Sequence, residues 1–350
     1  MELQLKNIGM IKEATVKIDG LTVIAGENDT GKSTVGKALF LHLKYLVFLK
    51  KLSLIEKDTE LKNKVYNDLK KDLSHSNILV NLIFSKQLSD DGNIKLTIGD
   101  KYLNLLIKNN QILYDDFLEK GLKLKNDIFF PIMIETPLVW NFNKFFNQLA
   151  LIESRLSTFG DKVEIERPFL LEDIHFKLLT NNENDNNNFN IEGIIKKIID
   201  GSFKEDDLGN FFFERNGNKI ELANTATGIK AFGILQILSK NNYLNKDTVL
   251  ILDEPEVHLH PKWQLEMAKI IVDLVKNDVK IVVNSHSPYM IEALELYSQK
   301  YNINRNFYLA QKKDDYAIID DVTDNLESIY AKLAKPIQTL EEQSLENFKW

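Results

Sequence analysis

Residues 26–34 have the sequence GENDTGKST, and this stretch decides the expected fold. A short apolar segment, LTVIAG, precedes it, and a segment with apolar residues at three- and four-residue spacing follows it. This pattern predicts a buried strand, a glycine-containing turn and a helix, which is the context that a phosphate-binding loop requires. Gly26 and Gly31 allow a tight turn whose backbone amides converge on phosphate oxygens, and the helix start adds its positive dipole end. The sequence therefore predicts a nucleotide site.

The side chains of this loop have distinct expected roles. Lys32 is expected to neutralise the β- and γ-phosphates, and the Ser33 hydroxyl is expected to ligate Mg²⁺. The predicted nucleotide-binding residues are Gly26, Glu27, Asn28, Asp29, Thr30, Gly31, Lys32, Ser33 and Thr34.

A second motif, LILDEPEVHLHP, occupies residues 250–261. Its apolar run followed by Asp253 and Glu254 has the form of a Walker B strand, in which Asp253 holds Mg²⁺ and Glu254 polarises the attacking water. A strand that ends in two solvated acids is the simpler alternative. A metal-hydrolase centre built on His258 and His260 is another, but no third nitrogen ligand at suitable spacing accompanies the pair. We expect both histidines to lie in the loop after the strand, packed there or in contact with a second subunit.

Two further segments carry candidate residues. In KIVVNSHSP (280–288) a buried strand delivers His286 to a turn, where it can sense the γ-phosphate; a purely structural histidine is the alternative. In ANTATGIKAFGILQ (223–236) small and hydroxyl residues precede Gly228 and an apolar helix. This segment predicts a second anion-binding helix N-terminus, although an ordinary capped helix would have the same pattern.

Composition limits the class of protein. The chain has 350 residues, 44% of them hydrophobic and 27% charged, which is typical of a soluble protein with a large core. The absence of cysteine excludes disulfides and thiolate metal sites and fits a reducing cytoplasm. A formal charge of −7 argues against a surface that binds polyanions everywhere, although a local basic face could bind DNA. We expect no signal peptide and no membrane-spanning segment, hence a cytoplasmic location.

The pattern of apolar residues predicts an α/β fold. We expect a nucleotide-binding core from residues 1–137 and 211–350, with a meander of short strands at about 78–114. DIFFPIMIETP (127–137) is expected to form a central strand. An inserted helical lobe is predicted over 138–210, with a flexible asparagine-rich loop at 181–190. Residues 211–222 predict a hairpin with Asn-Gly at its tip.

The order of P-loop, glycine-containing helix start, VLILDE and NSH resembles the ABC-type ATPase head. The resemblance implies a P-loop NTPase with a mixed sheet, an antiparallel β subdomain and a helical lobe, and ATP with Mg²⁺ as its ligands. It also implies that two heads enclose ATP and that a signature loop completes the partner's site. TATGIK stands at the signature position, so Thr225, Ala226, Thr227, Gly228 and Lys230 are the residues implied to act in trans. The family's usual signature serine is absent.

Motif spacing separates the subfamilies. Gly26 and Gly228 are much further apart than in transporter ATPases, and the aromatic residue that such proteins have before the P-loop is missing. The long heptad arms of SMC proteins are absent. The chain therefore resembles the stand-alone SMC/RecF-like and OLD-like bacterial ATPases, a group that includes phage-defence subunits such as those of Septu. No Toprim nuclease domain is expected, and Asp320-Asp321 is interpreted as the solvated end of a hairpin.

One element of the resemblance has no counterpart in the sequence. In the family, a glutamine after a central strand begins the loop that couples ATP to the helical lobe. Here Glu135 and Thr136 in IMIETP stand at that place, so the residue that performs this coupling stays open.

The resemblance implies Mg²⁺-dependent ATP hydrolysis by a chain that forms an ATP-dependent homodimer or higher oligomer. Such a chain would regulate a partner, which in phage defence would be a separate nuclease or other effector. The alternative is a RecF-like repair ATPase that clamps DNA. A transporter engine would need a membrane partner and a more compact motif spacing.

Overall fold

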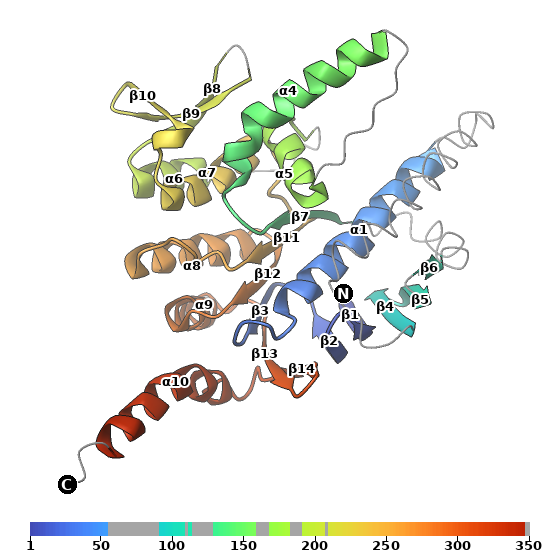
Figure 1. Ribbon diagram of the computed structural model, residues 1–350, viewed down its shortest axis with the longest axis vertical. Coiled ribbons are helices and arrows are strands. Elements are labelled where there is room, and N and C mark those ends of the chain that lie inside the picture. The colour runs from blue at the N-terminus through green and yellow to red at the C-terminus, as the bar shows by residue number, and fades with distance from the viewer. Residues whose placement is uncertain are drawn as a thin grey trace.

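The computed structural model describes residues 1–54, 91–108, 111–113, 129–158, 168–182, 191–206 and 209–346 (Figure 1). Its strands are β1 (Glu2–Ile8), β2 (Ile11–Lys17), β3 (Leu21–Ala25), β4 (Asp91–Ile98), β5 (Lys101–Lys108), β6 (Gln111–Leu113), β7 (Phe130–Ile134), β8 (Ser202–Glu205), β9 (Phe211–Arg215), β10 (Asn218–Glu221), β11 (Thr248–Asp253), β12 (Lys280–Ser285), β13 (Arg305–Lys313) and β14 (Tyr316–Asp321). Its helices are α1 (Lys32–Leu54), α4 (Val139–Thr158), α5 (Phe169–Leu179), α6 (Glu192–Ile199), α7 (Thr227–Lys240), α8 (Pro261–Val275), α9 (Pro288–Lys300) and α10 (Glu327–Glu346), with a short 3₁₀ helix, η2 (Leu222–Asn224).

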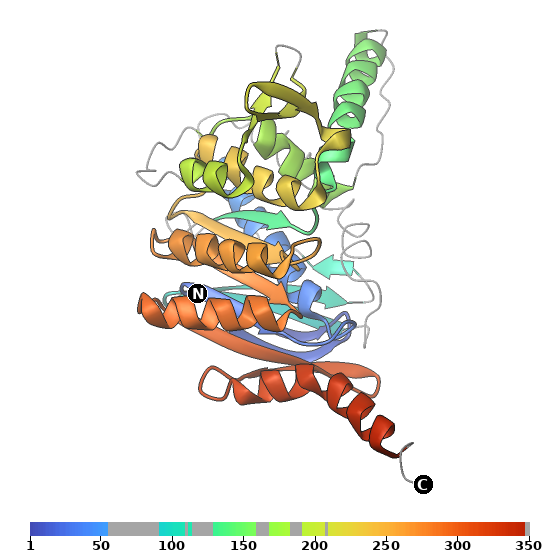
Figure 2. The same ribbon diagram turned by 90° about the vertical axis from the view of Figure 1, so that its left-hand side faces the viewer.

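A mixed sheet forms the centre of the molecule, with the strand order β6-β5-β4-β1-β2-β14-β13-β3-β12-β11-β7. The strands β13, β3, β12, β11 and β7 run parallel to one another. The strands β1, β2, β4, β5 and β6 are antiparallel, and β14 joins the two halves. In Figure 2 the helices α8 and α9 lie against one face of the sheet.

The parallel strands are buried on both faces, which explains their continuous apolar sequences. Along β11, Val249 and Ile251 pack into the core on the α1 side, whereas Leu250 and Leu252 pack into the core under α8 and α9. Because side chains alternate along a strand, every residue of such a run meets apolar neighbours. The two cores hold the ends of β3, β11 and β12 in place.

The structure corrects the expected position of β7. We expected a central strand, but β7 is the last strand in the order formed by the described residues. Its sequence is apolar because both faces are covered: Ile132 packs in one core and Met133 in the other. Pro131 lies within β7 and lacks the amide that a further strand would need, so it was the sequence signal for an edge strand.

The end of the predicted insertion, β8, and the two strands that follow it form a small sheet with the order β10-β9-β8. The predicted hairpin is present as β9 and β10, with Asn216 and Gly217 in its turn. Phe203 on β8 stacks on Trp140 of α4 with ring centroids 5.0 Å apart, and its amide donates to Gln236 Oε1 on α7 at 2.7 Å. These contacts join the small sheet to α4 and α7.

Several expected segments fall partly outside the described residues. The hairpin of β4 and β5 lies within the predicted meander, whereas residues 78–90, 109–110 and 114 of that meander are outside the described part, as are 183–190 of the asparagine-rich loop. The helices α4, α5 and α6 all lie between residues 139 and 199. The domain boundaries at 137 and 211 stay a prediction. None of the described helices is both long enough and apolar enough to cross a bilayer.

Burial of His42 in α1 predicts a pH-dependent stability. The side chain is 1% exposed, and burial lowers its pKa from 6.5 to about 3. The unfolded chain therefore binds a proton below pH 6.5 that the folded chain does not bind, so stability is full above pH 6.5 and is lost as the pH falls toward 3. Between pH 7 and pH 5 we expect this residue to lower the free energy of unfolding by about 2 kcal/mol. Denaturant unfolding of the wild type and of His42→Leu at both pH values measures the effect, and equal losses in the two proteins would contradict it.

Candidate active site

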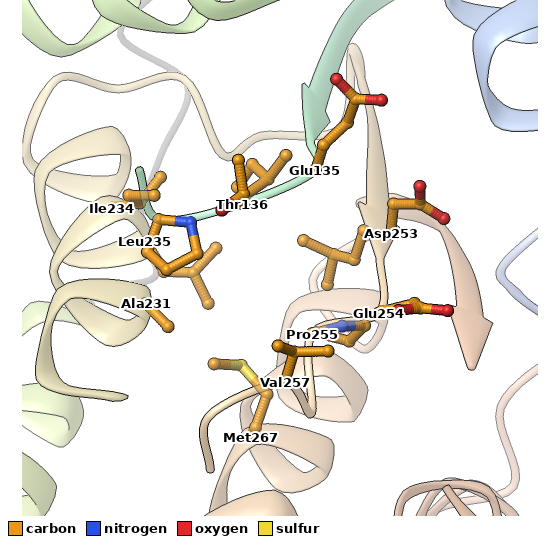
Figure 3. Close-up of a pocket in the computed structure, with 13 residues that line it drawn as sticks. Glu135, Thr136, Ala231, Ile234, Leu235, Asp253, Glu254, Pro255, Val257 and Met267 are labelled. Carbon is orange, nitrogen blue, oxygen red and sulfur yellow. The ribbon is translucent and has the colours of Figure 1, made fainter. Parts of the chain in front are cut away.

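The carboxyl ends of the parallel strands bring three acidic residues together. Asp253 is the last residue of β11, Glu254 follows it, and Glu135 follows β7, the neighbouring parallel strand. Figure 3 shows these carboxylates on the β11 side of a pocket whose opposite wall is α7. Glu254 has φ 51°, a left-handed conformation that is strained for a residue with a side chain, and its amide donates to the Asn284 carbonyl at 2.9 Å. This sharp turn ends the strand and leaves the Glu254 side chain half-buried.

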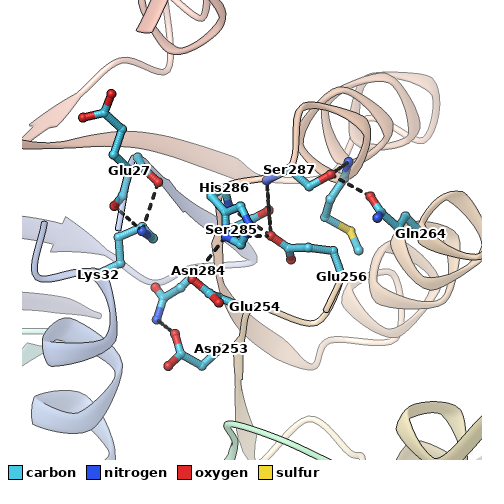
Figure 4. A network of polar contacts seen from close by, with 12 residues as sticks. Glu27, Lys32, Asp253, Glu254, Glu256, Gln264, Asn284, Ser285, His286 and Ser287 are labelled. Atoms are coloured by element: carbon cyan, nitrogen blue, oxygen red, sulfur yellow. Dashed lines mark hydrogen bonds and ion pairs between the residues drawn. The ribbon is translucent and has the colours of Figure 1, made fainter. Parts of the chain in front are cut away.

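The loop at 26–34 has the geometry of a phosphate cradle. A Cβ atom at Gly26 would lie 2.4 Å from the Ala310 carbonyl oxygen, and Gly31 has φ +83°. Both positions thus require glycine. Lys32 begins α1, is 5% exposed, and donates from Nζ to the carbonyls of Gly26 at 3.0 Å and Glu27 at 2.6 Å (Figure 4). Burial lowers the pKa of Lys32, and the carboxylates of Glu254 and Asp253 oppose that shift.

Ser33 and Asp253 meet although they are far apart in the sequence. The Ser33 hydroxyl donates to Asp253 Oδ1 at 3.0 Å, and the side-chain amide of Asn284 donates from Nδ2 to the same oxygen at 2.8 Å. Burial raises the pKa of Asp253, whereas the hydrogen bonds from Asn284 and Ser33 lower it. A hydroxyl and a carboxylate at this separation are hard oxygen ligands of the kind that Mg²⁺ favours. These two side chains therefore fit a magnesium ion.

His286 lies beside Glu254, on the turn that follows β12. Its Nδ1 is 3.1 Å from Glu254 Oε1, and the side chains of both residues are partly exposed. Because β12 pairs in parallel with β11, the two strands deliver these residues to the same edge. A carboxylate and an imidazole in contact can orient a water molecule and relay its proton.

A cavity of about 600 Å³ lies over the P-loop, a size typical of ligand sites. The P-loop lines it through Asn28, Asp29, Thr30, Gly31, Lys32, Ser33 and Thr34. Glu254 lines it as well, together with the β1–β2 turn and the β13–β14 hairpin. Two ion pairs join the P-loop to the C-terminal elements: Lys312 contacts Asp29, and Lys332 on α10 lies 3.4 Å from Glu27. The C-terminal elements therefore form part of the candidate site.

The loop at 225–230 has different neighbours. Thr225 is buried and its hydroxyl donates to the Glu221 carbonyl at 3.0 Å, whereas Ala226 is exposed and Thr227 begins α7. The Lys230 carbonyl accepts from Trp140 Nε1 at 2.9 Å, and Lys230 Nζ donates to Asn141 at 3.1 Å. Burial lowers the pKa of Lys230. These contacts join the loop to α4, and no hydrogen bond or ion pair found in the described part of the chain joins it to residues 26–34.

Glu135 and Lys37 form an ion pair that sequence reasoning did not identify. Lys37, on the first turns of α1, lies 2.8 Å from Glu135 Oε1. Glu135 is also close enough to Asp253 to raise the pKa of that carboxyl. It lines an apolar cavity of about 160 Å³ together with Ala231 and Met267. The sequence signal was available, since an acidic residue directly follows a parallel strand.

The remaining candidates lie outside this cluster. His260 caps α8 by accepting a hydrogen bond from the Lys262 amide at 3.3 Å, and His258 is an exposed residue with φ 66° in the loop after β11. Asp320 and Asp321 are exposed, and Asp321 Oδ1 accepts from the Thr323 hydroxyl at 2.7 Å. Within the described residues, no group of three or more His, Asp and Glu side chains is arranged as a metal site.

Two solved structures share this fold. An SMC head bound to the C-terminal winged-helix domain of ScpA aligns with a TM-score of 0.52 and 14% identity, covering 93% of this chain and 98% of that chain. The SMC head of Pyrococcus furiosus with an extended coiled coil, bound to the C-terminal domain of ScpA, aligns with a TM-score of 0.50 and 14% identity, covering 98% of each chain. At this identity the likeness concerns the fold alone, and it agrees with the expected ABC ATPase head.

Two curated proteins are similar in sequence over part of their length. The Retron Vc95 probable ATPase of Vibrio cholerae is 29% identical over a stretch covering 43% of this chain and 36% of that protein. An uncharacterized protein of Methanocaldococcus jannaschii is 30% identical over 32% of this chain and 13% of that protein. The aligned regions thus span little more than a third of the first relative and about an eighth of the second.

A sequence profile matches residues 21–292, which include the P-loop, the 225–230 loop, Asp253, Glu254 and His286. The profile is that of the family described as "AAA domain, putative AbiEii toxin, Type IV TA system". The chain belongs to this family of AAA domains, and its fold is similar to that of SMC heads.

Proposed function

We propose that the chain hydrolyses ATP at the P-loop cavity in a Mg²⁺-dependent reaction and uses ATP-driven dimerisation to regulate a partner. Two observations support the hydrolysis. Lys32, Ser33 and Glu254 line one cavity. Asp253 accepts a hydrogen bond from Ser33, and His286 contacts Glu254. These residues come from the ends of the parallel strands β11 and β12 and from the start of α1.

Each residue has a separate task in this proposal. Lys32 leaves the carbonyls of Gly26 and Glu27 to neutralise the phosphates, and the turn at 26–31 offers its amides to phosphate oxygens. Glu254 accepts a proton from the attacking water, and His286 orients that water or the γ-phosphate. Ser33 and Asp253 would hold Mg²⁺, which when bound supplies positive charge against the phosphates.

Dimerisation would bring the 225–230 loop to the partner's nucleotide. Within one chain this loop contacts α4 and the end of β10, while Ala226 at the start of α7 is exposed. An exposed helix start with small residues can offer backbone amides to an anion. In a two-fold dimer both sites are completed in the same way, because each chain contributes one P-loop and one such loop.

The partner would be an effector in phage defence, such as a separate nuclease. The family description names a putative toxin, and one relative is a probable ATPase of a retron. A RecF-like ATPase that clamps DNA is the alternative proposal.

Glu254→Gln removes the general base but keeps the size of the side chain. We expect ATP hydrolysis to fall on the order of 10³-fold, because only transition-state stabilisation is lost. In light-scattering measurements of mass, the variant should accumulate as a dimer when ATP and Mg²⁺ are added. Lys32→Ala should have the same mass with ATP as without it. A mass that never changes with ATP would contradict the dimer, and normal hydrolysis by Glu254→Gln would contradict the base. A second series with duplex DNA tests the alternative, which predicts an ATP-dependent, salt-sensitive complex.

A mixing experiment tests whether residues 225–230 act in trans. Lys32→Ala disables the P-loop, and Thr227→Arg blocks the start of α7 with a bulky side chain, so each variant alone should be nearly inactive. A mixed dimer has one site built from two intact parts, so mixing equal amounts should restore about a quarter of wild-type activity. No recovery on mixing, with both variants folded, would contradict the trans role.

The defence proposal predicts that nucleotide hydrolysis is needed for protection. Phage should form fewer plaques on cells that carry the gene with its genomic neighbours than on cells without them. Both Lys32→Ala and Glu254→Gln should remove this protection. Lys269→Ala, an exposed change on α8, is the matched control. Plaque counts that are equal for the wild type and the active-site variants would contradict the proposal.

A further inference from the structure

Glu256 is a buried carboxylate whose role the proposed mechanism does not include. It lies two residues after Glu254, in the turn between β11 and α8, and is 4% exposed. A buried charge is costly unless hydrogen bonds stabilise it. Glu256 is such a group, and it lies beside the candidate active site.

One oxygen of Glu256 holds the turn that carries His286. Glu256 Oε1 accepts hydrogen bonds from the Ser285 hydroxyl at 2.7 Å, the His286 amide at 2.9 Å and the Ser287 amide at 3.2 Å (Figure 4). The same oxygen lies 3.6 Å from His286 Nδ1. Three consecutive residues are thus tied to one atom, and this arrangement sets the backbone position of His286.

The second oxygen of Glu256 does not take part in these hydrogen bonds. Glu256 Oε2 is buried without a hydrogen-bond partner among the described residues. The hydrogen bonds that this carboxylate accepts therefore all come from residues 285–287. The carboxylate also lies close enough to Lys32 to oppose the lowering of the pKa of that lysine.

A neighbouring residue holds the same turn without reaching His286. Gln264 on α8 accepts from the Ser287 hydroxyl at 2.6 Å and donates to the Leu259 carbonyl at 3.1 Å. It therefore fastens the start of α9 to the turn after β11. Gln264 offers a matched comparison for Glu256.

We propose that Glu256 is a positioning residue that fixes the His286 imidazole against Glu254 by holding the 285–287 backbone. The proposal rests on the proposed ATP hydrolysis and on the role of His286 in it. Glu256 itself contacts neither nucleotide nor water in this scheme. It acts through the 3.1 Å contact between His286 Nδ1 and Glu254 Oε1.

The test compares Glu256→Ala and Glu256→Gln with the wild type in steady-state ATP hydrolysis. We expect Glu256→Ala to lower kcat on the order of 10- to 100-fold, because a misplaced catalytic group costs rate rather than binding. The KM for ATP should change by less than about twofold, since the P-loop contacts are intact. Glu256→Gln keeps one acceptor oxygen and the side-chain size, so it should recover most of the rate and remain folded if the alanine variant does not.

A double-mutant cycle separates positioning from stability. In a His286→Ala background, changing Glu256 should lower kcat little further, because the group that it positions is gone. Gln264→Ala should lower the Tm with at most a small change in kcat. Three results would overturn the proposal. The first is an additive loss of kcat in the double variant, the second is a wild-type rate in both Glu256 variants, and the third is a changed KM for ATP with a normal kcat. If His286→Ala hydrolyses ATP slowly while both Glu256 variants hydrolyse it at the wild-type rate, only the inference about Glu256 is overturned. If His286→Ala hydrolyses ATP at the wild-type rate, the proposed role of His286 is overturned as well.

Discussion

The common edge at which five parallel strands end is the constraint on which the candidate site depends. The register pairs Asp253 with Asn284 and Ser285 with Ala25, so the last residues of β11, β12 and β3 lie at the same level. Glu254 follows β11, His286 follows β12, and the P-loop follows β3. Because the strands are buried on both faces, their ends cannot shift without disturbing two hydrophobic cores. The position of each polar group at this edge follows from apolar packing inside the sheet.

The buried charges at this edge are stabilised by hydrogen bonds from neighbouring strands. Asp253 accepts from Ser33 and Asn284, and Lys32 donates to two carbonyls of its own loop. Such groups would be costly in an apolar interior, so the network that satisfies them also holds them in one geometry. Glu256 extends this network to the turn after β12. Preorganised polar groups of this kind are the usual source of transition-state stabilisation.

The 225–230 loop belongs to a different part of the molecule. Trp140 and Asn141 anchor it to α4, and an apolar cavity of about 160 Å³ lies between α7 and the end of β11. Glu135, Asp253 and Glu254 form the acidic part of the lining of that cavity, and Glu254 also lines the cavity over the P-loop. The 225–230 loop and the P-loop are thus held by separate sets of contacts within one chain.

Local patterns in the sequence by themselves determined the class of fold and the P-loop, because a glycine turn between a buried strand and a helix depends on neighbouring residues only. They also located Asp253, Glu254 and His286 at strand ends, since apolar runs and turns mark where strands stop. Tertiary structure decided which strands are neighbours: β7 is the last strand of the sheet formed by the described residues, and Glu135, which follows it, pairs with Lys37 of α1. It also brought Glu256 to the His286 amide and paired two P-loop acids with Lys312 and Lys332. Those contacts join residues far apart in the chain, and hydrophobic periodicity contains no information about which distant polar groups will meet.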